Sequence, residues 1–264
     1  MNRLPVAKTS KLYIGGDFVR SESGRTYEVQ GANVALASRK DLRDAVRAAR
    51  GALPGWAGLT AYNRGQVLYR IAEMLESRGA EFAELSGDKG EATAAIDRWI
   101  WYAGWSDKLA QVVGSSNPVA GPYFNFTVPE PVGVVGLIAP EEPALDGLVT
   151  RLAPVLVGGN TAVVIASEHH PLAAATLAEV LATSDVPGGV VNILTGREEE
   201  LASVLASHMD VNALDLAGAE GDTAELERLA ADNVKRVVRN GEGQSPWHAA
   251  AYLELKTVWH PIGV

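Results

Sequence analysis

Carboxylates gather directly after a buried apolar run, in the segment Pro140-Glu141-Glu142, and Asp146 follows four residues later. Oxygen ligands of this kind suit a hard cation such as Ca²⁺ or Mg²⁺. A solvent-facing elbow would have the same composition, and we favour that interpretation. His169 and His170 raise the question of a metal pair. Adjacent residues point apart as a helix begins, and no cysteine or third histidine accompanies them, so solvated turn residues are favoured.

Covalent catalysis by a thiol has no candidate in this chain. Its 264 residues contain no cysteine, which removes thiol nucleophiles, thiolate metal sites and disulfides together. No Ser-His-Asp spacing or Walker loop indicates another chemistry. The Gly-rich stretch GEGQSP is a weak signal that we interpret as a turn. The aromatic run Trp99, Trp101, Tyr102 and Trp105 suits a stacking platform for a base or flavin, but helix packing or a subunit interface is favoured.

The elements around the carboxylates form a strand–helix–strand unit. Residues 132–139 are an unbroken apolar run, as a parallel strand buried on both faces requires. Leu145, Leu148 and Leu152 then recur at helical spacing. Gly158, Gly159 and Asn160 end that helix, and a second strand follows at residues 161–165. Such units bind ligands at the carboxyl ends of their strands.

The same alternation of helix and strand continues to residue 238. It predicts helices over 171–184, 198–207 and 222–232, each followed by a strand at 190–194, 213–217 and 234–238. This pattern predicts an α/β fold with an open parallel Rossmann-like sheet and helices on both faces. Upstream we expect a hairpin over 11–29 and three helices that begin near Asp41, Thr60 and Glu91, the first closed by Pro54-Gly55.

Two further strands show period-2 alternation and predict a small antiparallel oligomerisation sheet. In the first, over residues 122–129, Phe124, Phe126 and Val128 alternate with polar residues. In the second, over residues 251–260, the apolar face is Leu253, Leu255 and Trp259. An exposed edge strand is a liability, so the second strand pairs either with the first or with another subunit. We expect pairing between subunits that buries both apolar faces.

Composition argues against two classes of partner, nucleic acids and membranes. The chain is 47% hydrophobic and 21% charged, and its net charge of −9 argues against a nucleic-acid partner. No apolar run reaches bilayer length, so we expect no membrane segment. The N-terminal sequence MNRLPVAKTSKL lacks the apolar core of a signal peptide, and a cytoplasmic location is expected.

The chain resembles the aldehyde dehydrogenase family over nearly its whole length. The matching pieces lie in family order: KLYIGGDFV, WYAGWSDKL, EPVGVVGLIAP, LAPVLVGGNTAVV, SEHHPL, DVPGGVVNILTG and the terminal YLELKTVW. The resemblance implies a cofactor domain, an oligomerisation strand and a tail strand. The family's catalytic domain, which carries a nucleophilic cysteine, would lie between residue 246 and the tail, where this chain has almost no residues.

Several chemical positions depart from the family pattern. The resemblance places the family's oxyanion asparagine at Glu142, where a carboxylate would repel the developing negative charge. It places the general-base glutamate at Asn240, which cannot accept a proton. The lysine that the family directs at the adenosine ribose corresponds to Ile165. We therefore expect no catalytic residues and no metal site.

Cofactor binding is expected to be vestigial. The resemblance implies Glu168, Gly218 and Pro140 as remaining cofactor-binding residues. Gly218 keeps a close backbone approach, but the family's neighbouring serine is replaced by Ala219, and Glu220 and Asp222 add negative charge where phosphate would bind. No cofactor is expected, although weak binding of NAD(P) is compatible with these residues.

The chain is predicted to consist of four parts. Residues 1–121 hold the N-terminal hairpin and helices of the cofactor domain, 122–131 an oligomerisation strand, 132–247 the Rossmann-like part and 248–264 the tail strand. The predicted function is that of a catalytically incompetent aldehyde-dehydrogenase-like protein. It would be a structural or regulatory subunit that forms a homo-oligomer, or a hetero-oligomer with an intact aldehyde dehydrogenase. The alternative is an NAD(P)-binding oxidoreductase subunit or nucleotide sensor that relies on a partner's catalytic domain.

Overall fold

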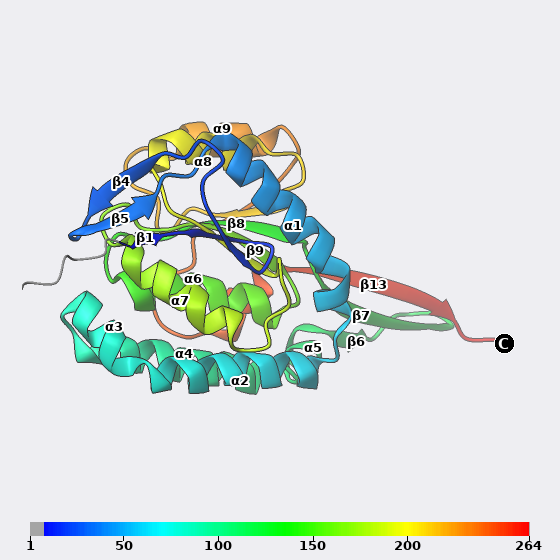
Figure 1. Cartoon of the computed structure of the whole chain (residues 1–264). Helices are drawn as coiled ribbons and strands as arrows, with labels where there is room; N and C mark the ends of the chain where they lie inside the picture. Colours follow the sequence, from blue (N-terminus) through cyan, green and yellow to red (C-terminus); the bar gives the residue numbers. More distant parts are fainter. Residues whose placement is uncertain (1–7, 264) are drawn as a thin grey trace, which may run out of the picture.

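A seven-stranded sheet in the order β12-β11-β8-β9-β10-β2-β3 forms the centre of the computed structural model, which describes residues 8–263 (Figure 1). Its parallel strands are β8 (Val134–Ile138), β9 (Thr161–Ile165), β10 (Val191–Leu194), β11 (Ala213–Asp215) and β12 (Arg236–Val238). Every residue of β8 and β9 is buried, as a parallel strand covered on both faces requires. The predicted fold class is confirmed. The signal-peptide prediction rests largely on residues 1–7, which lie outside the described residues.

Helices cover both faces of this sheet and create two hydrophobic cores (Figure 1). One face carries α2 (Ala61–Ser77), α3 (Gly79–Ser86), α4 (Lys89–Trp105), α6 (Ala144–Val157) and α7 (Pro171–Ala182). The other carries α1 (Arg39–Gly58), α8 (Glu198–Ser207) and α9 (Ala224–Ala231). Trp99 and Tyr102 on α4 are fully buried in the first core, so the aromatic run packs helices together.

The N-terminal hairpin differs from the expectation. KLYIGGDFV reverses within itself, as β2 (Leu12–Ile14) and β3 (Asp17–Val19), and β2 pairs antiparallel with β10 at the sheet edge. Gly15 and Gly16 both have positive φ, which permits a two-residue turn and explains why the chain turns there. A separate sheet has the order β1-β5-β4, with β1 (Thr9–Ser10), β4 (Thr26–Val29) and β5 (Ala32–Ala35). The hairpin predicted over 11–29 was therefore wrong.

Several helices also end at other residues than predicted, because tertiary contacts determine where they end. Helix α1 continues through Pro54 to Gly58, because the buried Trp56 anchors its last turn by donating from Nε1 to the Leu156 carbonyl at 3.2 Å. The helix predicted from Thr60 breaks at Arg78 into α2 and α3. The next divides into α4 and the short α5 (Leu109–Val113). Within residues 8–263, no helix is long and apolar enough to cross a bilayer.

An antiparallel arm projects from the body of the molecule (Figure 1). It has the strand order β13-β7-β6, with β6 (Ser115–Asn117), β7 (Tyr123–Pro131) and β13 (Leu253–Pro261). The short helix α10 (Pro246–Ala250) leads into β13. Strands β7 and β13 pair over nine residues, from Leu253 opposite Pro131 to Pro261 opposite Tyr123. The tail strand thus pairs within its own chain, and the expectation that this pairing joins two subunits was wrong.

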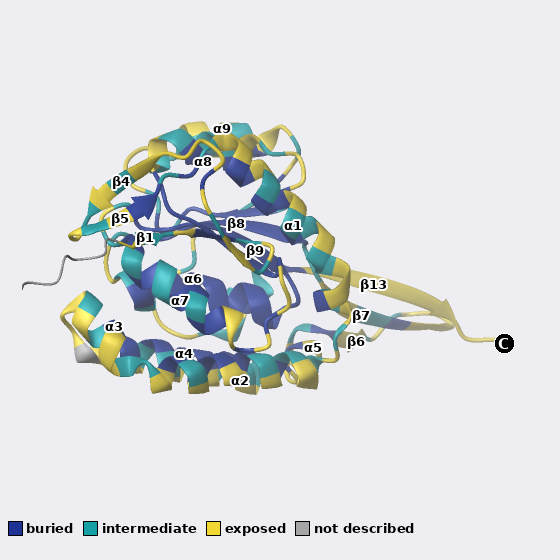
Figure 2. Cartoon of the chain, in the orientation of Figure 1, coloured by how far each residue is buried: buried dark blue, intermediate teal, exposed yellow. Residues whose placement is uncertain are grey.

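The two predicted apolar sets lie on opposite faces of this arm. Directly paired residues share a face, so Trp259, opposite Asn125, lies on the face that carries Leu255. Phe126, opposite Val258, lies on the other face with Phe124 and Val128. Both faces are largely exposed, as the exposed colour along β13 shows (Figure 2).

Candidate functional site

The elbow after β8 is shaped by close backbone packing at the carboxyl edge of the sheet. A Cβ on Gly218 would lie 2.3 Å from the Ile138 carbonyl oxygen and 2.5 Å from the Pro140 nitrogen. A Cβ on Gly147 would lie 2.5 Å from Pro140 Cγ. Gly218 therefore lets the loop between β11 and α9 lie directly against the end of β8. The close approach that requires glycine at this position is to the protein's own backbone.

Glu141 turns its carboxylate onto the loop between β9 and α7. It accepts hydrogen bonds from the Ser167 hydroxyl at 2.5 Å, the Glu168 amide at 2.8 Å and the His169 amide at 3.0 Å. Burial opposes ionisation of Glu141, but these three donors outweigh it and hold the pKa of the carboxyl below its ordinary value. The backbone donors of this loop thus already bind an anion, and that anion is a side chain of the same chain.

Glu168, the predicted cofactor-binding acid, is engaged by the protein itself. Its carboxylate pairs with Arg197, and that guanidinium lies 5.7 Å from the centre of the Tyr27 ring. The Tyr27 hydroxyl donates to the Glu168 carbonyl at 3.4 Å. Burial raises the pKa of the Tyr27 hydroxyl, and the negative charge of Glu168 adds to this effect.

Glu141 and Glu168 border a cleft of about 500 Å³ between α8 and α9. Seven of its eleven described lining residues are acidic, namely Glu141, Glu168, Glu198, Glu199, Glu220, Asp222 and Glu225. Asp222 accepts from the Ala224 amide at 2.9 Å and so occupies a donor at the start of α9. Burial raises the pKa of Glu198, and the nearby carboxylates of Glu220, Glu141 and Glu168 raise it further. We name this the acidic cleft.

The other carboxylates considered for a metal go to separate partners. Glu142 lies 3.2 Å from His170 Nε2, and Asp146 makes two 2.9 Å hydrogen bonds with the Arg98 guanidinium. Because Glu141 binds a different loop, the three carboxylates do not converge. Among the described residues there is no group of three or more acidic or histidine side chains placed to hold a metal ion.

Ile165 and Asn240 do not contribute polar side chains to the acidic cleft. Ile165 is buried in the core, on a strand between β8 and β10. The Asn240 carbonyl accepts a short hydrogen bond from Arg151, and its side-chain amide donates to the His248 carbonyl at 3.2 Å. This loop is therefore bound to α6 and α10.

One buried polar pair was not predicted from the sequence. Asp215 at the end of β11 is fully buried and accepts from the Tyr252 hydroxyl at 2.5 Å and the Ala217 amide at 2.8 Å. Arg151 Nε and His248 Nδ1, whose side chains also act electrostatically on Asp215, have no hydrogen-bond partner within residues 8–263. The available signal was an aspartate inside the apolar strand NALDLA.

The chain belongs to the aldehyde dehydrogenase family, whose family model matches residues 23–260. A putative aldehyde dehydrogenase, DhaS, of Bacillus subtilis is 33% identical over 257 residues, which are 90% of this chain and 51% of that protein. Human retinal dehydrogenase 2 is 32% identical over 261 residues, 90% of this chain and 50% of that protein.

Solved structures agree with this assignment. An NAD⁺ complex of an aldehyde dehydrogenase from Bacillus cereus has a TM-score of 0.81 and 28% identity, and the match covers 87% of this chain and 50% of that one. A Thermus thermophilus protein, HpcC, has a TM-score of 0.81 and 30% identity, with 87% and 47% covered. The chain spans about half the length of the relatives it matches.

The cleft residues do not suit the cofactor that the family implies. A dinucleotide brings a negatively charged pyrophosphate, which favours free backbone amides and cationic side chains. Here Glu141 and Asp222 already accept from backbone amides of the two loops, and five further carboxylates line the walls. Arg197 is paired with Glu168. The donor set therefore opposes an anionic ligand.

Proposed function

We propose that this chain is a non-catalytic member of the aldehyde dehydrogenase family that acts as a structural or regulatory subunit. The observation that carries the proposal is the occupation of both loops of the acidic cleft by the chain's own carboxylates, Glu141 and Asp222. A family member built on this fold but lined with acids loses the attraction for nucleotide phosphates. The fold remains available as a scaffold.

The chemistry expected of the family also lacks its groups in this chain. There is no cysteine to act as nucleophile. Glu142 stands where the resemblance places an oxyanion donor, and loss of one such donor costs roughly 100–1,000-fold in rate. Asn240 offers no basic oxygen at the position of the general base. We expect the purified chain to produce no NADH or NADPH from a panel of aldehydes. Protein-dependent turnover that survives repurification would contradict the proposal.

Nucleotide affinity gives the sharper test of the cleft. In calorimetry with NAD⁺ and NADP⁺ we expect a dissociation constant in the millimolar range or no binding. The combined variant Glu220→Gln, Asp222→Asn and Glu225→Gln removes three negative charges and should tighten binding at least tenfold. A dissociation constant near a micromolar for the unmodified chain would instead favour the nucleotide sensor or the NAD(P)-binding oxidoreductase subunit.

A matched control separates the cleft from the overall charge of the protein. The combined variant Glu28→Gln, Glu84→Gln and Glu254→Gln removes the same number of charges from exposed positions away from the acidic cleft. It should leave nucleotide binding unchanged. An equal gain in both variants would show that net charge, and not the cleft, controls affinity.

The antiparallel arm offers the surface through which subunits would assemble. Trp259 is 58% exposed and Leu255 is 55% exposed on one face, while Phe124 is 49% exposed on the other. The outer edge of β13 has no partner strand among the described residues. We therefore assign residues 122–131 and 248–264 to self-assembly or to pairing with an intact aldehyde dehydrogenase. Sizing with light scattering tests the first, and co-purification from the source organism with identification of the bound protein tests the second.

A further inference from the structure

A second cavity, separate from the acidic cleft, lies between the N-terminal strands and α7. Its volume is about 760 Å³, within the size range of sites for small organic ligands. Leu172, Ala175, Thr176 and Glu179 form one wall and follow the spacing of a single helix face. The β2–β3 hairpin forms the opposite wall with Phe18, Lys11 and Arg20. None of these residues lines the acidic cleft.

Two cations flank the paired part of the hairpin. The strand pairing ends at Leu12 opposite Val19, and Lys11 and Arg20 are the next residues along the chain on either side of it. Both line the cavity, where two like charges repel each other. Neither side chain has an ion pair or hydrogen bond to any residue in the range 8–263. An anion between them would relieve this repulsion.

The acidic residues of the cavity do not neutralise these cations, because they have a cation of their own. Arg78 lies 2.7 Å from both the Glu179 and the Glu81 carboxylates. Lys8 also approaches Glu179, at 3.6 Å. Lys11 and Arg20 are therefore left with uncompensated positive charge in a protein whose net charge is −9.

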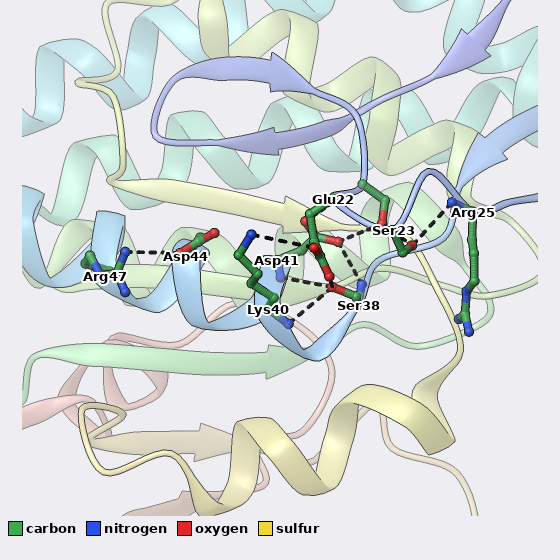
Figure 3. Close-up of polar contacts among 9 residues, drawn as sticks. Glu22, Ser23, Arg25, Ser38, Lys40, Asp41, Asp44 and Arg47 are labelled. Atoms are coloured by element: carbon green, nitrogen blue, oxygen red, sulfur yellow. Dashed lines mark hydrogen bonds and ion pairs between the residues drawn. The ribbon is translucent and has the colours of Figure 1, made fainter.

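The rim of the cavity is held in place by the start of α1. Ser21 and Gly24 belong to the turn that borders the cavity. The Ser21 hydroxyl donates to Asp41 at 2.8 Å, and the Glu22 amide donates to the same carboxylate at 3.0 Å. The Ser38 amide also donates to Asp41, at 2.8 Å (Figure 3). Asp41 thus ties the turn to the capping box of the helix. These hydrogen bonds within the protein hold the rim in place without a ligand.

From this arrangement we propose that the cavity binds a small organic anion with an apolar body. Lys11 and Arg20 bind the anionic group, while Phe18, Leu172 and Ala175 contact the apolar part. The site is independent of the proposed function, because it shares no lining residue with the acidic cleft and lies apart from the arm strands.

Phenyl phosphate is a suitable probe, followed by amide chemical shifts in the isotope-labelled full chain. Saturable shifts are expected at residues 9–11, 18–20 and 172–179, with at least tenfold weaker affinity for inorganic phosphate alone and no saturation by benzyl alcohol. The absence of saturable shifts at these amides would overturn the proposal. Equal affinity for phosphate and phenyl phosphate would contradict the role of the apolar wall.

Substitutions connect the binding to the two cations. Lys11→Gln with Arg20→Gln should weaken phenyl phosphate at least tenfold, and both positions are exposed, so the amide spectrum will otherwise be retained. Arg43→Gln with Arg47→Gln removes the same charge from exposed positions on α1 outside the cavity and should change affinity less than twofold. An equal loss in both double variants would show attraction to general surface charge and refute the assigned site.

Discussion

The Tyr252 hydroxyl donates to the Asp215 carboxylate at 2.5 Å in the interior of the protein. Asp215 is the last residue of β11, and Tyr252 directly precedes β13. One hydrogen bond therefore joins the carboxyl edge of the central sheet to the root of the arm. Burial raises the pKa of the Asp215 carboxyl, although Tyr252 and the Ala217 amide oppose that effect.

We expect Tyr252→Phe to lower the free energy of unfolding by about 1.5–3 kcal/mol, because it removes a hydrogen bond to a buried carboxyl. The double variant Asp215→Leu with Tyr252→Phe should lose less than the sum of the two single changes, since neither partner is left unsatisfied. Urea unfolding measures all four free energies. Additive losses would show that the two residues act independently.

The raised pKa of Asp215 predicts the direction of a pH effect. A carboxyl whose pKa is higher in the folded state contributes stability below its ordinary pKa and loses that contribution as pH rises through the folded value. Asp215→Asn cannot ionise, so its stability relative to the unmodified protein should increase from pH 4 towards neutral pH. Unfolding free energies measured across this range provide the test, and a relative stability that falls with pH would contradict the burial argument.

Glu141 should show the opposite pH dependence. Its pKa is lowered in the folded protein, so its contribution is present above the ordinary glutamate pKa and is lost as pH falls through the lowered value. The stability difference between the unmodified protein and Glu141→Gln should therefore shrink in acid. A Glu141→Gln difference that stays constant in acid would show that these hydrogen bonds do not depend on its charge.

Gly218→Ala should destabilise the protein by about 1–3 kcal/mol, because the new methyl group would meet the backbone at Ile138 and Pro140. Gly241→Ala is the matched control, since a Cβ there meets nothing within 4 Å and its φ is not positive. Thermal and urea unfolding of both variants measure the loss of stability. Equal stability of the two would mean that the loop between β11 and α9 moves aside freely.

Assembly through the arm should depend on its exposed apolar residues. Val258→Glu with Phe124→Glu places charge on one face without removing the β7–β13 pairing, and it should lower the mass measured by light scattering. Glu84→Ala, at an exposed position, should leave the mass unchanged. An unchanged mass in the double variant would remove that face from the assembly surface.

Periodicity alone was sufficient for the central fold. Continuous apolar runs such as residues 134–138 are typical of inner parallel strands, and the helices between them show the matching spacing. The collinear motifs also predicted the family. These signals are local in sequence, because each depends on the order of polar and apolar residues within one segment.

Tertiary contacts decided what no single segment specifies. The carboxylate of Glu141 could bind a metal, solvent or a backbone loop, and only the approach of residues 167–169 selected the loop. Alternation identified β7 and β13, but only their register showed that Phe126 and Trp259 lie on opposite faces. The burial of Asp215 is explained only by Tyr252, which follows 37 residues later and donates a hydrogen bond to its carboxylate. The sequence by itself determined the family and the strands and helices of the central sheet, while the N-terminal strand pairing and the partners of the charged groups depended on distances that exist only in the folded chain.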